Sequence, residues 1–341
     1  MRQDKKDYTL VDVGEAGIIQ RIQQVASGRA CHVKKGIGDD CAVLEAKGAF
    51  AQLVTTDTLI EGVHFTDQTL SPEGLGWKAL ATNVSDIAAM GGTPQTAFLS
   101  LALRPETEVA FLDQFLAGFE ALSKKTGVVL AGGDTVESPS CAVVTVMLLG
   151  VCPKADVVYR SGAEVGDHIW VTGRLGDAAG GLFLLKNKAK AIPQEYASLI
   201  RAHQKPVPPF ELGRALGKAG LAHAMIDLSD GVAKDLAHIC DQSGVGALLQ
   251  GSSVPVSDPL KKLAYQVSHP VLGWALQGGE DYGLLFTAAP AEESRVLSLS
   301  AQVSGGGSTR IGKIIEDRGI WLDSPEGRSR LASPGFLHFS K

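Results

Sequence analysis

Acidic residues recur in six short segments of the sequence, each next to an apolar run. The segments are 36–40 (Gly-Ile-Gly-Asp-Asp), 55–58 (Thr-Thr-Asp-Thr), 83–86 (Asn-Val-Ser-Asp), 132–135 (Gly-Gly-Asp-Thr), 227–231 (Asp-Leu-Ser-Asp-Gly) and 278–281 (Gly-Gly-Glu-Asp). Asp and Gly are common turn residues, so one such segment alone carries no functional meaning. Strand ends in α/β domains, however, converge on one rim where ligands bind. We therefore expect several of these carboxylates to meet there.

Carboxylates that meet in this way need cations. Two unit charges 4 Å apart repel each other by about 4 kcal/mol at an effective dielectric constant near 20. Oxygen ligands select Mg²⁺, Ca²⁺ or Mn²⁺ rather than zinc. Thr55 and Thr56 add further oxygen atoms beside Asp57. Because Mg²⁺ keeps waters and binds substrate phosphates, the pattern favours a nucleotide as ligand.

The glycines beside the acidic residues fit a phosphate ligand. Gly133, before Asp134, would let the backbone approach a phosphate closely. Ser229 and Asp230 precede a helical pattern, where free N–H groups favour anions. A sequence resembling a P-loop at 307–313 has isoleucine where Ser or Thr is required, so we reject it. The sequence contains no G-x-G-x-x-G, G-x-S-x-G or H-E-x-x-H motif.

Strands and helices alternate in the expected secondary structure. We expect strands at 51–56, 93–103, 142–152, 167–172, 224–227, 284–287 and 311–315, and a short buried strand at 128–131. The strand at 51–56 should stop at Asp57. Helices are expected at 74–90 and 107–126, and after residue 230, where Ser229 or Asp230 should provide the N-cap. The pattern restarts after Pro153, so we predict two domains, 1–152 and 153–341.

Composition excludes several classes of protein. The 341 residues carry a net charge of −5, which argues against a nucleic-acid or anionic-membrane partner. Five cysteines without a C-x-x-C pair argue against a disulfide framework and a zinc site, and favour a reducing compartment. The charged N-terminus does not resemble a signal peptide, and the longest apolar run, 142–151, is too short to span a bilayer. We therefore expect a cytoplasmic protein.

In this order, the six segments resemble the thiamine-monophosphate kinase family. That family belongs to the superfamily of aminoimidazole ribonucleotide synthetase, selenophosphate synthetase and a hydrogenase maturation factor. The resemblance covers about residues 14–339, and its most specific parts are 36–44, 55–65, 226–231 and 278–282. It implies an α/β (α+β) fold in two domains. The N-terminal domain, with a mixed sheet, would bind ATP and Mg²⁺ and form a homodimer, and the C-terminal domain would be α+β.

The resemblance also implies roles for individual residues. Residues that match metal ligands, for several Mg²⁺ ions, are Asp40, Thr55, Thr56, Asp57, Asp86, Asp134, Asp227 and Asp230. Residues that match nucleotide contacts are Gly133, Asp134, Arg160 and Ser229, and Asp57, Asp134 and Arg160 would be catalytic. His64, Glu280 and Phe336 match positions that hold the thiamine moiety, since a carboxylate and an aromatic ring suit a cationic thiazolium.

The hypothesis that follows is transfer of the γ-phosphoryl group of ATP to thiamine monophosphate. The acceptor phosphate oxygen is already ionised near neutral pH, so no general base is needed. Catalysis would rest on in-line positioning and charge neutralisation. Three alternatives remain open: another ATP-dependent synthetase of the superfamily, a non-catalytic nucleotide- or metal-binding protein, and a dimeric scaffold.

Overall fold

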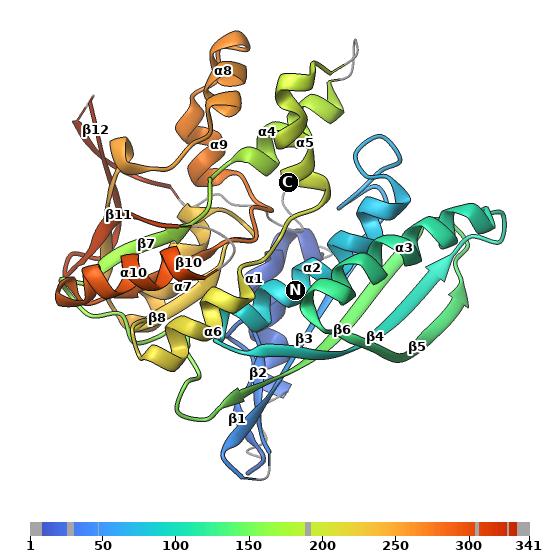
Figure 1. The fold of residues 1–341 in the computed structure, drawn as a ribbon, viewed down its shortest axis with the longest axis horizontal. Coiled ribbons are helices and arrows are strands. Elements are labelled where there is room, and N and C mark those ends of the chain that lie inside the picture. Colours follow the sequence, from blue (N-terminus) through green and yellow to red (C-terminus); the bar gives the residue numbers. More distant parts are fainter. Residues whose placement is uncertain are drawn as a thin grey trace, which may run out of the picture.

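Two mixed β-sheets with helices packed against them form the molecule (Figure 1). The computed structural model describes residues 9–25, 31–46, 48–187, 192–303, 307–325 and 327–332. This architecture confirms the expected α/β (α+β) class. The helix α1 (Leu10–Val25) precedes the first sheet and is interrupted at Gly14, where φ is 67°.

The first sheet has the strand order β1-β2-β3-β6-β4-β5. Its strands are β1 (Val33–Lys35), β2 (Ala42–Glu45), β3 (Phe50–Ile60), β4 (Thr93–Leu103), β5 (Val129–Glu137) and β6 (Val143–Pro153). Neighbours are antiparallel except β4 and β5. A parallel pair needs a crossover connection, which α3 (Val109–Thr126) provides. The strand β5 lies at one edge of the sheet.

The second sheet has the order β13-β12-β9-β11-β7-β10-β8. Its strands are β7 (His168–Thr172), β8 (Ala224–Asp227), β9 (Gly246–Gln250), β10 (Leu284–Ala288), β11 (Ser308–Ile315), β12 (Gly319–Ser324) and β13 (Gly327–Arg330). The accompanying helices are α4 (Asp177–Lys186), α5 (Ala197–Gln204), α6 (Phe210–Ala219), α7 (Val232–Ser243), α8 (Asp258–Gln266), α9 (Val271–Gln277) and α10 (Glu293–Gln302). Short 3₁₀ turns are η1 (Gln194–Tyr196), η2 (Gly251–Ser253) and η3 (Pro290–Glu292).

Helix α2 (Pro72–Ala89) is buried along almost its whole length. It begins at the N-cap Ser71, whose hydroxyl accepts a hydrogen bond from the Gly74 N–H at 3.1 Å. It contacts β3, β4 and β6 of the first sheet, and also α6, β8 and β10 of the second half. Residues carried by α2 can therefore reach both sheets.

The α2–α3 packing requires close approach of the two backbones. A Cβ on Gly118 of α3 would lie 1.8 Å from the carbonyl oxygen of Glu73. Only glycine fits there, because such a contact is far inside van der Waals distance. This glycine fixes how closely α3 holds α2 against the first sheet.

Three local predictions are wrong. The strand β3 does not stop at Asp57 but continues to Ile60, because the pairing with β6 extends to Val143. The strand β5 runs to Glu137 and is exposed rather than buried, because it lies at the sheet edge. The N-cap of α7 is Gly231, with φ of 112°, and neither Ser229 nor Asp230 provides it.

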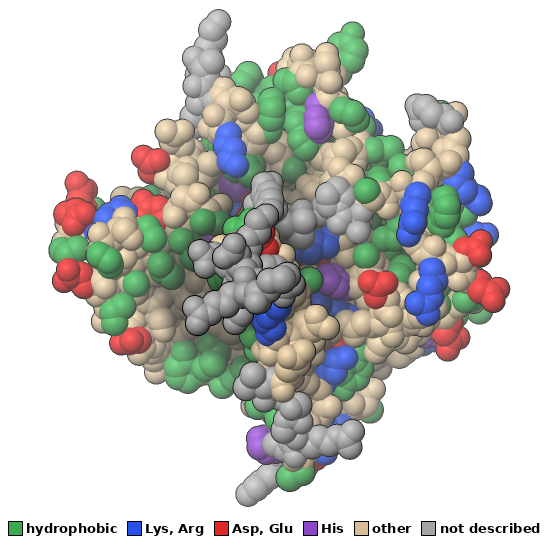
Figure 2. All heavy atoms as spheres, turned by 180° about the vertical axis from the view of Figure 1, so that it is seen from behind, with side chains coloured by type: hydrophobic (Ala, Val, Ile, Leu, Met, Phe, Trp, Pro, Cys, Tyr) green, Lys and Arg blue, Asp and Glu red, His purple; other side chains and the backbone are tan. Residues whose placement is uncertain are grey.

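None of the helices in the described part of the chain combines the length and the apolar composition that a membrane span requires. All five cysteines are free. Acidic and basic side chains are mixed over the face shown in Figure 2. The domain boundary near residue 153 stays a prediction, which the two separate sheets support.

Candidate active site

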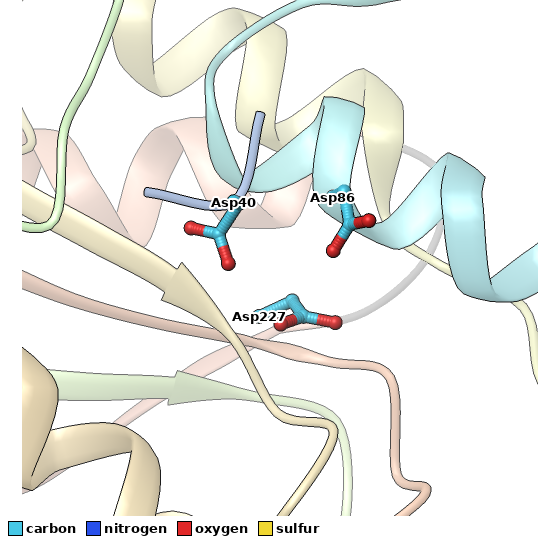
Figure 3. A group of neighbouring side chains, drawn as sticks. All are labelled: Asp40, Asp86 and Asp227. Carbon is cyan, nitrogen blue, oxygen red and sulfur yellow. The ribbon is translucent and has the colours of Figure 1, made fainter. Parts of the chain in front are cut away.

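Three carboxylates from distant parts of the chain meet between the two sheets. They belong to Asp40 in the β1–β2 loop, Asp86 on α2 and Asp227 at the end of β8. One oxygen of each lies within 4.8 Å of the others. Figure 3 shows the three carboxyl groups around a common space. We call these three residues the carboxylate cluster.

The cluster is electrostatically unfavourable without a cation. Burial, followed by the charge of Asp40, raises the pKa of Asp227 to about 8. Burial and the neighbouring charges of Asp57, Asp227 and Asp40 raise the pKa of Asp86 well above its usual value. Burial also raises the pKa of Asp40, although the Arg160 guanidinium opposes it. A pKa of about 8 means that the Asp227 carboxyl mostly holds a proton at neutral pH when no cation is bound.

The donor set fits a hard divalent cation. Oδ2 of Asp40 and Oδ2 of Asp227 are buried and accept no hydrogen bond of ordinary geometry within the described part of the chain. Buried carboxylate oxygens normally have partners, so these two have capacity left for a ligand. The hydroxyl of Thr55 donates to Oδ2 of Asp86 and thereby orients that carboxylate. Oxygen donors of this kind suit Mg²⁺, Ca²⁺ or Mn²⁺.

Arg160 and Asp57 flank the cluster. Nη2 of Arg160 lies 2.6 Å from Oδ1 of Asp40, a buried ion pair that joins segments 120 residues apart. Asp57 lies within β3; burial raises its pKa, the Thr82 side chain opposes this, and the charge of Asp230 adds to it. The charge of Asp57 acts on Asp86, which places Asp57 beside the cluster.

Thr56 and Asp230, which were also predicted as metal ligands, are not members of the carboxylate cluster. Thr56 is exposed and, by strand alternation, points to the opposite face from Thr55. Asp230 forms an ion pair of 2.6 Å with Lys234. Ser229 donates a hydrogen bond of 3.3 Å to Asp227 and thus supports the cluster.

Asp134 does not join the cluster. In the first sheet Asp57 pairs with Val146, Val146 with Leu99, and Leu99 with Gly133. Three strand spacings of about 4.8 Å place the Gly133–Asp134 segment roughly 14 Å from Asp57. A Cβ on Gly133 would lie 1.7 Å from the Leu99 carbonyl oxygen, so glycine is required here by strand packing as well.

A cleft of about 870 Å³ opens beside Asp57 and Asp230. It extends to His64 and Glu280, so it joins the acidic residues to the predicted substrate contacts. Aromatic walls come from Phe65, Phe183, Trp274 and Tyr282. Nδ1 of His64 accepts a hydrogen bond of 3.0 Å from the Ile60 N–H, which fixes the imidazole ring at the cleft. Phe336 lies outside the described residues.

Glu280 has two buried partners that the sequence did not reveal. Its Oε1 lies 2.8 Å from Nζ of Lys78, and its Oε2 lies 3.0 Å from Nδ1 of His203. Burial raises the pKa of Glu280, but the charge of Lys78 and the hydrogen bond from His203 prevail and lower it to about 2. A single lysine within the otherwise uncharged run 74–85 of the expected helix could have signalled this pair.

The chain is similar to known proteins over most of its length. Residues 38–152 match the N-terminal domain of AIR synthase related proteins, and residues 164–322 match their C-terminal domain. The thiamine-monophosphate kinase of Escherichia coli O157:H7 is 39% identical over 330 residues, which cover 96% of this chain and 98% of that protein. The chain belongs to the thiamine-monophosphate kinase family.

Solved structures of the family superpose closely. AaThiL complexed with AMPPCP and TMP has a TM-score of 0.85 and 32% identity, covering 97% of this chain and 98% of that one. The thiamine-monophosphate kinase of Stenotrophomonas maltophilia K279a has a TM-score of 0.75 and 38% identity, covering 90% and 95%. The resemblance of the six acidic segments to the thiamine-monophosphate kinase family is therefore confirmed.

Proposed function

We propose that this protein transfers the γ-phosphoryl group of ATP to the phosphate of thiamine monophosphate, giving thiamine diphosphate and ADP. The observation that carries the proposal is the cleft, which connects Asp57 and Asp230 beside the carboxylate cluster with His64 and Glu280. Relatives at 33–41% identity are thiamine-monophosphate kinases, and AaThiL forms a complex with AMPPCP and TMP.

The reaction breaks the bond between the γ-phosphorus and its bridging oxygen. A phosphate oxygen of thiamine monophosphate forms the new bond, and ADP leaves. Because the acceptor oxygen is ionised near neutral pH, no side chain has to remove a proton. The residues instead position the two phosphates in line and neutralise their charge, which is how phosphoryl transfer is generally catalysed.

Asp40, Asp86 and Asp227 would hold Mg²⁺, with Asp57 and Asp230 beside them. Mg²⁺ supplies charge neutralisation to the phosphate oxygens when bound. Arg160 is oriented by Asp40 and provides a permanent positive charge at the same place. The aromatic residues Phe65 and Trp274 suit the flat, cationic ring of thiamine.

Asp134 and Gly133 take part in this proposal through the nucleotide. A triphosphate with its nucleoside is long enough to extend from Asp57, beside the cluster, toward β5, roughly 14 Å away by the spacing of strands. Phe336 and Thr56 stay family-based proposals for substrate and metal contact. Their contributions can be tested by substitution once activity is established.

A homodimer is a further part of the proposal. All nine residues of β5 are exposed, including Val129 at 63% and Val136 at 52%. An exposed apolar edge strand is a ready site for pairing with another chain. Light scattering after gel filtration should give twice the monomer mass, and Val129→Lys should shift the protein toward monomer. A wild-type monomer at micromolar concentration would contradict the dimer.

A cytoplasmic location is proposed on the basis of the five free cysteines. The net charge of −5 supports partners that are small molecules rather than nucleic acid.

The deciding experiment is turnover by purified protein with ATP, Mg²⁺ and thiamine monophosphate, followed by chromatography of thiamine diphosphate and ADP. Equal amounts of both products are expected, and Asp57→Asn serves as the inactive control. A panel of other phosphorylated and amide acceptors separates the superfamily synthetases. ATP binding without any product would favour a non-catalytic nucleotide-binding protein.

A further inference from the structure

Lys78 is a buried charged residue that pairs with Glu280 of the cleft wall. Its side chain is 1% exposed, and the His203 side chain is fully buried, whereas the Glu280 side chain is 26% exposed and lines the cleft. A buried ammonium group is costly unless it is paired. Lys78 therefore depends on Glu280 for its charge balance.

The two partners fix both oxygens of the Glu280 carboxylate. A carboxylate only accepts hydrogen bonds, so Nδ1 of His203 must carry the hydrogen in this contact. Nζ of Lys78 donates to the other oxygen. With both oxygens engaged by buried partners, the orientation of the carboxylate is fixed, and the exposed part of the Glu280 side chain borders the cleft.

The backbone around Glu280 also needs external support. Glu280 has φ of 69° and Tyr282 has φ of 48°, conformations that residues with a side chain rarely adopt. The N–H of Glu280 donates to the Ser229 carbonyl at 2.7 Å, and the N–H of Tyr282 donates to the Leu228 carbonyl at 2.8 Å. The segment that presents Glu280 is thus tied to the residues that follow Asp227 of the carboxylate cluster.

Helix α2 carries a second connection between the two ends of the site. Lys78, Thr82 and Asp86 are spaced by four residues and lie on one face of α2. Lys78 contacts Glu280, Thr82 interacts with Asp57, and Asp86 belongs to the carboxylate cluster. Each step of four residues spans about 6 Å along the axis, so α2 sets the spacing between these three contacts.

We propose that Lys78 is a positioning residue, which holds Glu280 for substrate binding and fixes its distance from the carboxylate cluster through α2. This proposal rests on the proposed function and adds to it. Because Lys78 neutralises Glu280, the carboxylate presents hydrogen-bond acceptors to the thiamine moiety rather than a net negative charge.

Steady-state kinetics of Lys78→Met, Glu280→Gln and the double variant test the proposal. Each single variant should raise KM for thiamine monophosphate at least tenfold, with KM for ATP changed less than twofold. The double variant should lose no more than the worse single variant, because the two residues act as one unit. The double variant lacks both the Lys78 ammonium and the Glu280 carboxylate, so no buried charge is left unpaired. Its KM therefore still tests the proposal if Lys78→Met alone does not fold.

Asp167→Asn is the matched control for loss of a buried carboxylate that contacts a basic side chain. Asp167 is buried and lies 2.9 Å from His223, away from the cleft. This variant should melt at a lower temperature and keep the wild-type KM for thiamine monophosphate. An equal rise of KM in Asp167→Asn would show that KM reports general destabilisation, and the proposal would fall.

Two other results would overturn the proposal. One is a wild-type KM for thiamine monophosphate in the double variant. The other is a double variant whose rise in KM is the product of the rises in the two single variants, which would mean that Lys78 contacts the substrate independently of Glu280. The proposed function fails separately, because in that case the wild-type protein itself forms no thiamine diphosphate.

Discussion

Replacing Asp227 by Asn should stabilise the protein when no divalent cation is present. Asp227 is 2% exposed, and its pKa of about 8 lies far above the ordinary value of 3.8. At pH 7 the folded protein must therefore either hold a proton on this carboxyl or bear an unfavourable charge. The substitution removes that requirement, while an amide oxygen can still accept the hydrogen bond from Ser229.

The size of the effect follows from the pKa difference. A group whose pKa is raised in the folded state destabilises it by about 1.4 kcal/mol per pH unit above the unfolded pKa, which gives about 4 kcal/mol at pH 7. Repulsion calculated for two charges separated by 4.8 Å is about 3.5 kcal/mol at a dielectric constant of 20, which is of the same order. The Arg160 guanidinium partly compensates the charge of Asp40. We therefore expect Asp227→Asn to raise the free energy of unfolding by roughly 2–4 kcal/mol.

Wild-type stability without a divalent cation should depend on pH. The folded state binds more protons than the unfolded state between the two pKa values, so wild-type stability should fall as pH rises from about 4 to about 8. Asp227→Asn should show a flatter profile and nearly match wild type at pH 4. With Mg²⁺ the order should reverse, because the wild-type cluster gains binding energy that the variant lacks.

Thermal unfolding in EDTA and in Mg²⁺, at several pH values, measures both effects. In EDTA at pH 7 to 8 the variant should melt several degrees higher, taking roughly 2 °C per kcal/mol for a chain of this size. Asp113→Asn, an exposed position on α3, is the matched control and should change neither profile. A variant that melts below wild type in EDTA at pH 8, or that responds equally to Mg²⁺, would refute the electrostatic reasoning.

Three further outcomes are expected. Asp57→Asn should reduce turnover by at least about 100-fold with an unchanged circular dichroism spectrum; near-normal activity at saturating Mg²⁺ would remove Asp57 from the site. Because the pKa of Glu280 is lowered to about 2, this residue contributes about 3 kcal/mol to the free energy of unfolding, which is lost as pH falls from about 4.5 to 2. Denaturant titrations should therefore show a smaller loss of unfolding free energy over this pH range for Glu280→Gln than for wild type. Equal losses in the two proteins would contradict the pairing of Glu280. Gly118→Ala should cost about 1–3 kcal/mol of unfolding free energy, because its Cβ would clash with the Glu73 carbonyl; an unchanged melting temperature would argue against the close α2–α3 packing.

The local pattern of apolar residues was enough to predict most of the helices and strands. The spacing of apolar residues, together with the glycine and proline residues that flank it, predicted α2 and β4 close to their observed bounds. It could not predict where β3 ends or whether β5 is buried. Those properties depend on which strand lies alongside, and a pairing partner is not encoded in the local pattern.

The candidate site, too, could be predicted only in part from the sequence. The sequence by itself determined which residues carry acidic oxygen atoms, and its resemblance to a family indicated the reaction. Only the tertiary structure decided that Asp40, Asp86 and Asp227 meet while Asp134 lies across the sheet. It also decided that Lys78 is buried against Glu280, about 200 positions further along the chain. Contacts of such separation arise from the packing of whole elements against each other, and α2 makes these contacts because it is packed between the two sheets.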